Sequence, residues 1–443
     1  MSKNYEEEHN YNLYSWSAQN QINPIVITDA QGVFIFDKNG NKYYDLSSQL
    51  VNMNIGHKHP YVIEAIANQA KELPFVAPFY ASTVRSEAAK RIIEIAPDNM
   101  SKVFFTNGGA EANEHAIRIA KQYSSRNKIL SGYYSYHGST YGASSLSGDP
   151  RRFYTENPPA PGFVKFLNPY LYRSPFNFET EEEATDIYLR LLEEQIILEN
   201  PYNIAAIWFE GIVGSNGVLV PPKGYYQGVR KICDKYGILM VMDEVMVGFG
   251  RTGKWFSCEH FGFNPDMITF AKGVTSGYVP LGGVIISNEI ADFFDNTPVI
   301  TGLTYSGHPM GCATAIANMD VLVNEKLIKN AEKMGKVLAR KLQELEVNHH
   351  SIGDVRSCGM ISAIEFVKDR DTKERLATYG EDSEGLMGEI KAELFKNGLA
   401  SFGRESLIMV APPLTISEEQ LIDIFERLDK VCAFADNVVD SLK

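Results

Sequence analysis

The stretch ILMVMDEVMVGFGRTG, residues 238–253, decides how this chain folds, together with the shorter run ITFAKGV, residues 268–274. Each begins with apolar, β-type residues; the first stops at Asp243 and Glu244, and the second stops at Lys272. Short apolar runs of this kind are typical of strands buried in a parallel sheet. Because ligands of open α/β sheets bind at the carboxyl ends of strands, we predict that Asp243 and Lys272 meet at a binding site.

An aspartate and a lysine at neighbouring strand ends suit one kind of cofactor chemistry. The lysine can form a Schiff base with a carbonyl group, and the aspartate can hold a protonated ring nitrogen, as pyridoxal phosphate (PLP) requires. A single charged residue at a strand end is more often a solvated surface group, so the pair gains weight only from other motifs. The sequence thus predicts a PLP site with Lys272 and Asp243 as its catalytic residues.

Composition limits the class of protein. The 443 residues allow two or three core-forming units, and a net charge of −13 without a Lys/Arg-rich block argues against a nucleic-acid partner. The five cysteines are scattered, and we find neither a signal peptide nor an apolar stretch long enough to span a membrane. His57 and His59 lack a third ligand, so we predict no metal site. We expect a cytoplasmic protein with free thiols.

Strand-like runs alternate with amphipathic stretches up to about residue 300. Besides the two runs above, the predicted strands are 102–107, 128–138, 204–210 and 282–287. This alternation predicts an α/β fold with a mostly parallel sheet covered by helices on both faces. Residues 139–178 form a long Gly-, Pro- and Tyr-rich excursion, which at this length is more often functional than idle.

The two ends of the chain are expected to share a smaller α+β unit. Residues 25–45 predict a hairpin that turns at Asn39-Gly40, and the chain after residue 300 combines a long helical stretch, 309–347, with short strands. Chain termini often meet, so the hairpin is expected to join the C-terminal unit. We therefore divide the chain into an arm and hairpin (1–60), a large PLP-binding domain (61–300) and a small domain (301–443) that starts with an interface loop (301–310).

Two further motifs have the chemistry of a PLP site. Gly108 and Gly109 join the predicted strand 102–107 to a helix, where free backbone N–H groups can bind a phosphate; an ordinary helix start capped by Asn107 is the alternative. Tyr136 follows the next strand, where it can stack on a pyridine ring or serve as a core aromatic. The neighbouring His137 either fixes Asp243 or is purely structural.

Five motifs together resemble the class III aminotransferases, the ω-amino acid group of PLP fold type I. They are NGGAEAN (107–113), YHG (136–138), DEV with GFGRTG (243–253), FAKG (270–273) and TYSGHP (304–309). The resemblance runs over nearly the whole chain and implies a large domain with a mostly parallel seven-stranded sheet, plus a smaller α+β domain built from both termini. It also implies an obligate homodimer, with possible further pairing to a tetramer, whose active sites are shared between subunits.

The resemblance assigns roles residue by residue. Lys272 would hold PLP as a Schiff base and then transfer protons, while Asp243 would keep the pyridine nitrogen protonated. The other residues implied at the cofactor are Val245 and Tyr136 on the ring faces, Gly109 and Ala110 at the phosphate, His137 beside Asp243, Glu210 near the phenolic edge, and Thr304 at the neighbouring subunit's phosphate.

The substrate is narrowed by two departures from the family pattern. The γ-aminobutyrate and ornithine branch tends to carry Arg at the position of Ser139 and a second Glu at that of Ser215. The chain is most similar to the taurine–2-oxoglutarate type, so we expect taurine or β-alanine as donor and 2-oxoglutarate or pyruvate as acceptor. Another ω-amine donor such as γ-aminobutyrate, or a racemase or aminomutase of the same fold type, is the alternative.

An arginine is needed for the acid group of such substrates, because guanidinium binds carboxylate and sulfonate oxygens in pairs. Arg404 is one candidate, although Phe402 stands where many relatives have a mobile arginine. Arg152, or its neighbour Arg151, is the second candidate, and surface solvation or an internal ion pair is an equally good explanation of each arginine. Trp16, in the SWSAQ element of the arm, is a further substrate-binding candidate.

Overall fold

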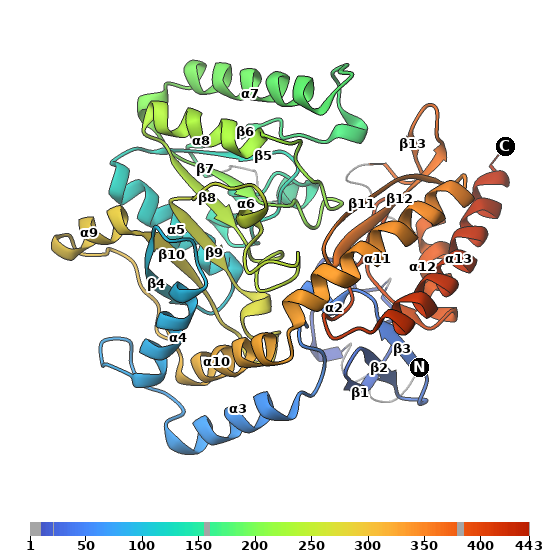
Figure 1. Cartoon of the computed structure of the whole chain (residues 1–443), viewed down its shortest axis with the longest axis horizontal. Helices are drawn as coiled ribbons and strands as arrows, with labels where there is room; N and C mark the ends of the chain where they lie inside the picture. The colour runs from blue at the N-terminus through green and yellow to red at the C-terminus, as the bar shows by residue number, and fades with distance from the viewer. Residues whose placement is uncertain (1–9, 21, 155–159, 379–384, 443) are drawn as a thin grey trace.

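The large sheet has the predicted architecture (Figure 1). The computed structural model describes residues 10–20, 22–154, 160–378 and 385–442. In spatial order, the seven strands of the sheet are β4 (Met100–Thr106), β10 (Gly282–Ser287), β9 (Met267–Phe270), β8 (Leu239–Asp243), β7 (Ile204–Glu210), β5 (Lys128–Gly132) and β6 (Phe163–Phe166). Within this sheet β10 alone runs antiparallel to its neighbours, which confirms a mostly parallel seven-stranded sheet.

The predicted strand 128–138 is wrong beyond Gly132. There the chain bends, because the hydroxyl of Ser135 donates to the Gly132 carbonyl at 2.8 Å and the Ser135 carbonyl accepts the amide of Gly148 at 3.0 Å. The excursion 139–178 also contains β6, whose four residues show no clear period. The bend after Gly132 carries the chain away from the sheet and toward the site described below.

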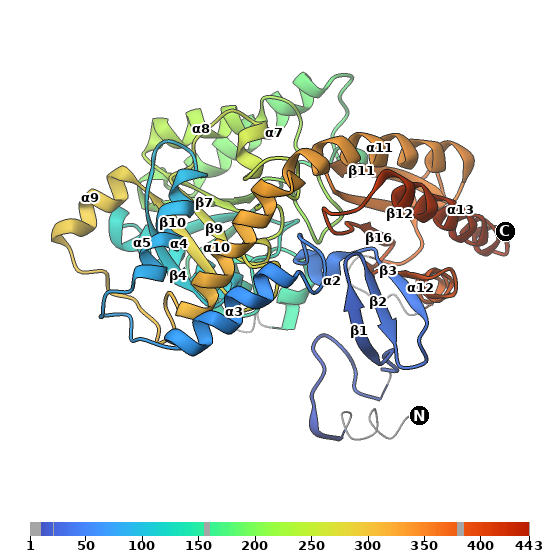
Figure 2. The same ribbon diagram turned by 60° about the horizontal axis from the view of Figure 1, so that its bottom comes forward.

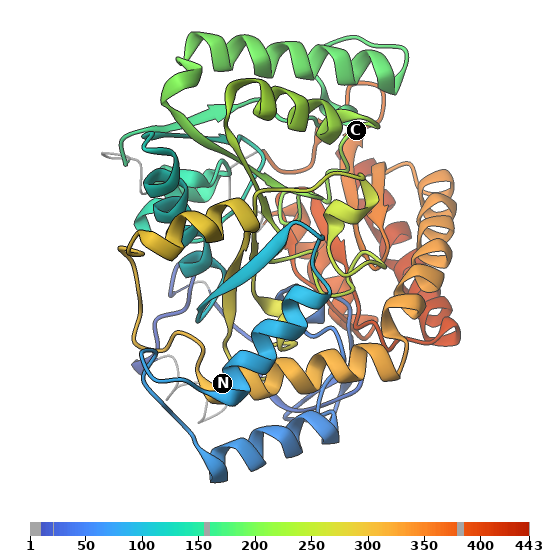
Figure 3. The same ribbon diagram turned by 60° about the vertical axis from the view of Figure 1, so that its left-hand side comes forward.

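Helices cover both faces because alternate side chains of each strand point to opposite sides. In β8, Val241 packs in one apolar cluster, and Met240 and Met242 pack in the other. The first cluster is covered by α5 (Gly109–Ser124), α6 (Tyr141–Leu146) and α9 (Asn288–Asn296). The second is covered by α4 (Thr83–Glu94), α7 (Glu181–Leu198), α8 (Tyr225–Tyr236) and α10 (Pro309–Asn324), and α3 (Pro60–Glu72) lies against α10 (Figure 3).

Strands from both chain ends meet in the smaller part of the molecule (Figure 2). Its first sheet has the order β1 (Ile27–Gln31), β2 (Phe34–Asp37), β3 (Lys42–Asp45) and β14 (Leu399–Ala400). Its second sheet has the order β11 (Ile352–Cys358), β12 (Ile361–Asp369), β16 (Leu407–Val410) and β15 (Gly403–Arg404), with β13 (Glu374–Arg375) beside β12. The division at residues 60 and 300 stays a prediction.

The expected helical stretch 309–347 is two helices. Lys326 takes a φ of 56° and separates α10 from α11 (Leu327–Asn348), which packs against α13 (Glu418–Asp440). Further helices in the described segments are α12 (Leu386–Lys396) and the short α2 (Ser48–Val51), with 3-10 turns η1 (Pro150–Tyr154), η2 (Leu171–Arg173), η3 (Pro201–Asn203), η4 (Ser257–His260) and η5 (Lys272–Val274). Among the described residues, no helix has both the length and the apolar character needed to cross a membrane.

Arg251, in the loop after β8, connects the large sheet to both chain ends. Its guanidinium is fully buried and donates to the carbonyl oxygens of Met360 and Pro412 at 3.0 and 2.6 Å, and to Oδ1 of Asn54 at 2.7 Å. Buried donors need partners of this kind. These bonds fix the loop that follows Asp243 against the N-terminal and C-terminal segments at once.

Candidate active site

Lys272 and Asp243 stand at the carboxyl ends of adjacent parallel strands. Asp243 is the last residue of β8 and pairs in register with Thr269 of β9, while Lys272 follows the end of β9 directly after Ala271. Lys272 has a φ of 47°, in the left-handed region that strains a residue with a side chain. The structure thus brings the two predicted catalytic residues to the same edge of the sheet.

The amine of Lys272 is available for chemistry. It has no hydrogen-bond partner within the described part of the chain. Burial lowers the pKa of Lys272, and the charge of Arg151 lowers it further, whereas Asp243 and Glu210 act in the opposite direction. A lysine with a depressed pKa offers a neutral amine, which can act as a nucleophile and as a base.

Asp243 is held by three nitrogen groups, an amide side chain, an imidazole and a backbone N–H. Its Oδ2 accepts a hydrogen bond from Nδ2 of Asn113 at 2.8 Å and lies 2.7 Å from Nδ1 of His137, and its Oδ1 accepts the amide of Val245 at 3.0 Å. The His137 ring is buried, and its Nε2 has no partner among the described residues. The contact agrees with one of the two interpretations of His137, the partner of Asp243, and its role at a cofactor stays a prediction.

Asn113 is a site residue that the sequence analysis misses. Its Nδ2 also donates to the carbonyl of His137 at 2.8 Å, and its Oδ1 accepts from Nε1 of Trp208 and Oγ1 of Thr269, both at 3.0 Å. Its place at the end of the NGGAEAN motif, on a buried face of α5, was the only available signal. We call Asp243, His137, Asn113, Trp208 and Thr269 the aspartate network.

The start of α5 forms an open cradle for an anion. A Cβ added to Gly108 would have no heavy atom of the described residues within 4 Å. No side chain of the described residues caps the start of α5 with a hydrogen bond. A Cβ on Gly109 would come within 2.8 Å of Cγ1 of Val245, so glycine permits this close approach. The amides of Gly109 and Ala110 stand at this uncapped start, which suits a phosphate.

Glu210 ends β7 beside Asp243. Its Oε1 accepts the amide of Tyr136 at 2.9 Å, and its Oε2 accepts the amide of Gly214 at 2.8 Å. Burial raises the pKa of Glu210 to about 7, with His137 opposing the rise and Asp243 adding to it. Near neutral pH this carboxyl can therefore both donate and accept a hydrogen bond.

Tyr136 brings an arginine to the site. The guanidinium carbon of Arg151 lies 3.4 Å from the centre of the Tyr136 ring, a cation–π contact, and the Tyr136 hydroxyl is 2.8 Å from Oγ of Ser139. Arg152 instead donates to the carbonyl of Gly148 at 2.5 Å and has its guanidinium near two neighbouring aromatic rings. Arg151 thus contacts a predicted cofactor residue.

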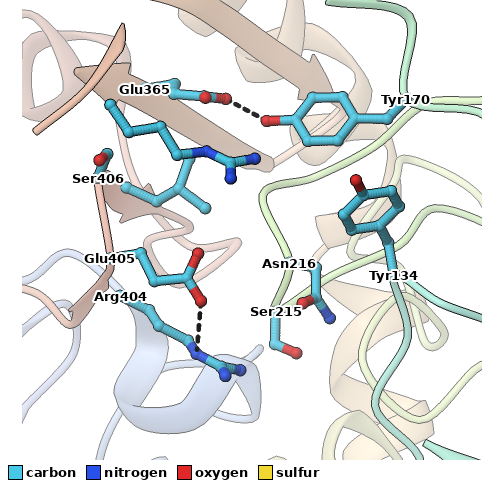
Figure 4. A pocket seen from close by; sticks show the side chains of 10 residues that line it. Tyr134, Tyr170, Ser215, Asn216, Glu365, Arg404, Glu405 and Ser406 are labelled. Atoms are coloured by element: carbon cyan, nitrogen blue, oxygen red, sulfur yellow. Dashed lines mark hydrogen bonds and ion pairs between the residues drawn. The ribbon is translucent and has the colours of Figure 1, made fainter. Parts of the chain in front are cut away.

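Arg404 joins Arg151 at the buried carboxylate of Asp149. Nη1 of Arg404 donates to Oδ2 of Asp149 at 2.7 Å, and Nε of Arg151 donates to the same oxygen at 2.9 Å. Nη2 of Arg151 also donates to Oγ of Ser215 at 3.0 Å. Figure 4 shows Arg404 extending toward the loop of Ser215 across a cavity that Tyr134, Tyr170 and Asn216 also line. We call Arg151 and Arg404 the arginine pair; Asp149 was not predicted.

Two predicted residues lie at the surface of the single chain. Trp16, on the N-terminal arm, is 65% exposed, and Thr304 lies exposed in the loop before α10. Figure 2 shows the arm extending from the smaller part of the molecule. Their assigned roles stay predictions, because the role of Thr304 involves a second subunit and that of Trp16 involves a substrate.

Comparisons with known proteins decide the family. A family model described as aminotransferase class-III matches residues 15–432. The chain belongs to the class III aminotransferases. The crystal structure of taurine:2-oxoglutarate aminotransferase from Bifidobacterium kashiwanohense, in complex with PLP and glutamate, is 44% identical to it with a TM-score of 0.94, covering 97% of both chains. Putrescine–pyruvate aminotransferase from Pseudomonas aeruginosa is 36% identical (90% of this chain, 88% of the relative), and taurine–pyruvate aminotransferase from Bilophila wadsworthia is 34% identical (94% of each).

The predicted cofactor and fold type are confirmed, since class III aminotransferases use PLP and the structural relatives are fold type I transaminases. The residues of this aminotransferase fit the group. Among the described residues, the Lys272 amine has no hydrogen-bond partner, no side chain caps the start of α5, and neither a lysine nor an arginine pairs with Asp243. The individual roles predicted for Val245, Tyr136 and the other residues stay predictions.

Proposed function

We propose that this aminotransferase moves the amino group of an ω-amino acid of the taurine or β-alanine type to a 2-oxo acid, 2-oxoglutarate or pyruvate, in a ping-pong cycle. The observation that carries the proposal is the arginine pair beside Tyr136. Guanidinium groups bind carboxylate and sulfonate oxygens, which these donors and acceptors carry. The 44% identity to a taurine:2-oxoglutarate aminotransferase supports the same choice.

The residues of the chain have separate tasks in this reaction. PLP, when bound, supplies an electron sink that stabilises negative charge at the reacting carbon. Lys272 would anchor the cofactor and move the proton at that carbon, a task that the lowering of its pKa by burial favours. Asp243, held by His137, would keep the ring nitrogen of the cofactor protonated, and Tyr136 and Val245 would hold the ring.

The second candidate function is transfer of the amino group of another ω-amine to pyruvate. The similarity to a putrescine–pyruvate aminotransferase favours it. Two positions argue against γ-aminobutyrate as this amine, because the γ-aminobutyrate branch tends to carry charged residues where this chain has Ser139 and Ser215. Ser139 pairs with the Tyr136 hydroxyl, and Ser215 accepts from Arg151 without adding a charge. A racemase or aminomutase would use Lys272 in the same way but would release no oxo product.

A panel of donors and acceptors tests the proposed function. Purified enzyme loaded with PLP is mixed with taurine, β-alanine, γ-aminobutyrate or putrescine and with either oxo acid. We expect turnover of taurine or β-alanine, with one aminated oxo acid formed for each oxo product. If no ω-amino sulfonate or carboxylate reacts, the proposed function is wrong; an amine converted without amination of the added oxo acid indicates a non-transferring enzyme.

We also propose a cytoplasmic homodimer with shared sites. The exposed apolar residues Phe79 (81% exposed) and Ile300 (76% exposed) are unusual for a free surface, and Ile300 precedes the loop of Thr304. The five cysteines, all in described segments, are free thiols, as in a reducing compartment. Light scattering gives the mass in solution, and a monomer with full activity would contradict the shared sites.

A further inference from the structure

Asp149 is a fully buried carboxylate bound by two arginines, Arg151 two residues away in the sequence and Arg404 from a distant part of the chain. Its exposed fraction is 0%, and Arg404 lies 255 residues further along the sequence. The Oδ1 atom accepts the backbone amide of Arg151 at 2.9 Å and its Nε at 3.2 Å, and Oδ2 accepts Nε of Arg151 at 2.9 Å and Nη1 of Arg404 at 2.7 Å. Nη2 of Arg151 also donates to Oδ2.

The carboxylate of Asp149 is charged and is shared by both cations. Burial alone opposes ionisation, but Arg151 and then Arg404 outweigh it, so the pKa of Asp149 lies below its ordinary value. Two guanidinium groups at such short range repel each other unless an anion lies between them. Asp149 supplies that anion, and its position therefore sets where both side chains end.

Each arginine keeps donors that Asp149 does not use. Nη1 of Arg151 and Nη2 of Arg404 have no partner within the described residues, and Nε of Arg404 is 3.8 Å from Glu405, beyond hydrogen-bond distance. The cavity lined by Arg404 and Ser215 also contains Asn216, whose Nδ2 is buried and unpartnered in the described structure. Arg404 and Asn216 thus bring unpaired donors to a cavity that Glu365 and Glu405 also line, and such donors suit an anionic ligand group.

We propose that Asp149 is a specificity-determining positioning residue, which gathers Arg151 and Arg404 into one receptor for the acid group of the substrate. The proposal rests on the proposed function, because it assigns the receptor to the sulfonate or carboxylate of the ω-amino donor. Asp149 acts through the arginines and does not touch the substrate. The cation–π contact of Arg151 with Tyr136 places the receptor beside a residue predicted to hold the cofactor.

The test separates binding of the acid group from the chemistry. Holoenzyme with Asp149→Asn is mixed with taurine, β-alanine or 1-aminopropane, which has no acid group, and the visible absorbance of the cofactor is followed without an acceptor. We expect the half-saturating concentration of both acid donors to rise about tenfold or more, with the maximal rate and the 1-aminopropane reaction unchanged within about twofold. Asp186→Asn, an exposed acid on α7, is the matched charge control.

A fall in the half-saturating concentration of the acid donors in Asp149→Asn would overturn the proposal. If Asp149 merely competed with substrates for the arginines, Asp149→Asn would add positive charge and tighten the acid donors. Equal effects on all three amines would show a structural role only. Asp149→Glu, which keeps the charge but displaces it, covers the case in which the amide variant does not fold; an unchanged half-saturating concentration of taurine in Asp149→Glu contradicts positioning.

A second measurement does not depend on activity. Propane-1-sulfonate and glutarate have acid groups but no amine, and we expect each to raise the melting temperature of the wild-type holoenzyme and not that of Asp149→Asn. If the wild type converts no ω-amino acid but shows this difference, the proposed function fails while the positioning role of Asp149 stands. If both proteins respond alike, the positioning role is wrong whatever the substrate.

Discussion

Two buried carboxylates of the site, Asp243 and Asp149, are held in opposite ways. Asp243 lies in the aspartate network, where an amide, an imidazole and a backbone N–H bind it and no arginine does so in the described structure. Asp149 is bound by two guanidinium groups. A carboxylate without a resident cation can serve a cationic ligand group, whereas one already paired with two cations positions those cations for something else.

The difference predicts which kinetic constant each group controls. In the proposed mechanism, a change in the aspartate network should affect the chemistry of every donor, because Asp243 would act at the cofactor ring. A change at the arginine pair should affect the half-saturating concentration of donors that carry an acid group, because it acts on a binding contact away from the reacting carbon. The variants below sharpen or break this distinction, beginning with the largest expected effect.

Lys272→Ala should abolish turnover of all donors, by more than about 10³-fold, because the proposed anchor of the cofactor and the proposed base at the reacting carbon are both lost. The fold should survive, since no hydrogen bond of the described structure depends on this amine. Initial rates and the cofactor absorbance, with exposed Lys254→Ala as control, check this. Wild-type rates in Lys272→Ala would remove the lysine from the mechanism.

Asp243→Asn should lower the maximal rate for taurine and 1-aminopropane alike, by roughly 10²-fold, because the neutral amide no longer favours a protonated ring nitrogen. The half-saturating concentrations should change little. Stopped-flow absorbance with each donor measures both constants. If this variant instead raised only the half-saturating concentration of acid donors, as expected for Asp149→Asn, the distinction between the two carboxylates would be lost.

Asn113→Ala should reduce the rate about tenfold, since Asp243 loses one of its three donors, and should lower the free energy of unfolding by about 1–3 kcal/mol. The stability loss follows from Trp208 and Thr269, whose donors would lose their shared acceptor inside the core. Denaturant unfolding and donor kinetics check the two effects. As a control, Asn330→Ala removes an amide that donates to Leu414 and Ile416 far from the cofactor site, so it should spare the rate.

Local sequence patterns were sufficient to predict the strands of the large sheet. The features that they missed depend on contacts between residues far apart in the sequence. Strands 204–210 and 282–287 are found at their predicted bounds, because buried strands are continuous apolar runs. β5 is shorter than predicted because a side-chain hydrogen bond at Ser135 ends it, which composition does not show. Asn113 and Asp149 escaped prediction for a similar reason, since their partners lie up to 255 residues away.

Ser215→Glu tests the arginine pair and has the smallest expected effect of these variants. Ser215 accepts from Nη2 of Arg151 without adding charge, whereas a carboxylate at this position would compete with the substrate for the same guanidinium. Because this contact is partly exposed, the expected effect is only about a threefold rise in the half-saturating concentration of taurine, with 1-aminopropane unaffected. Ser215→Gln, of similar size but neutral, is the control. Equal weakening of taurine by both variants would mean that space at this position, and not charge on Arg151, limits the donor.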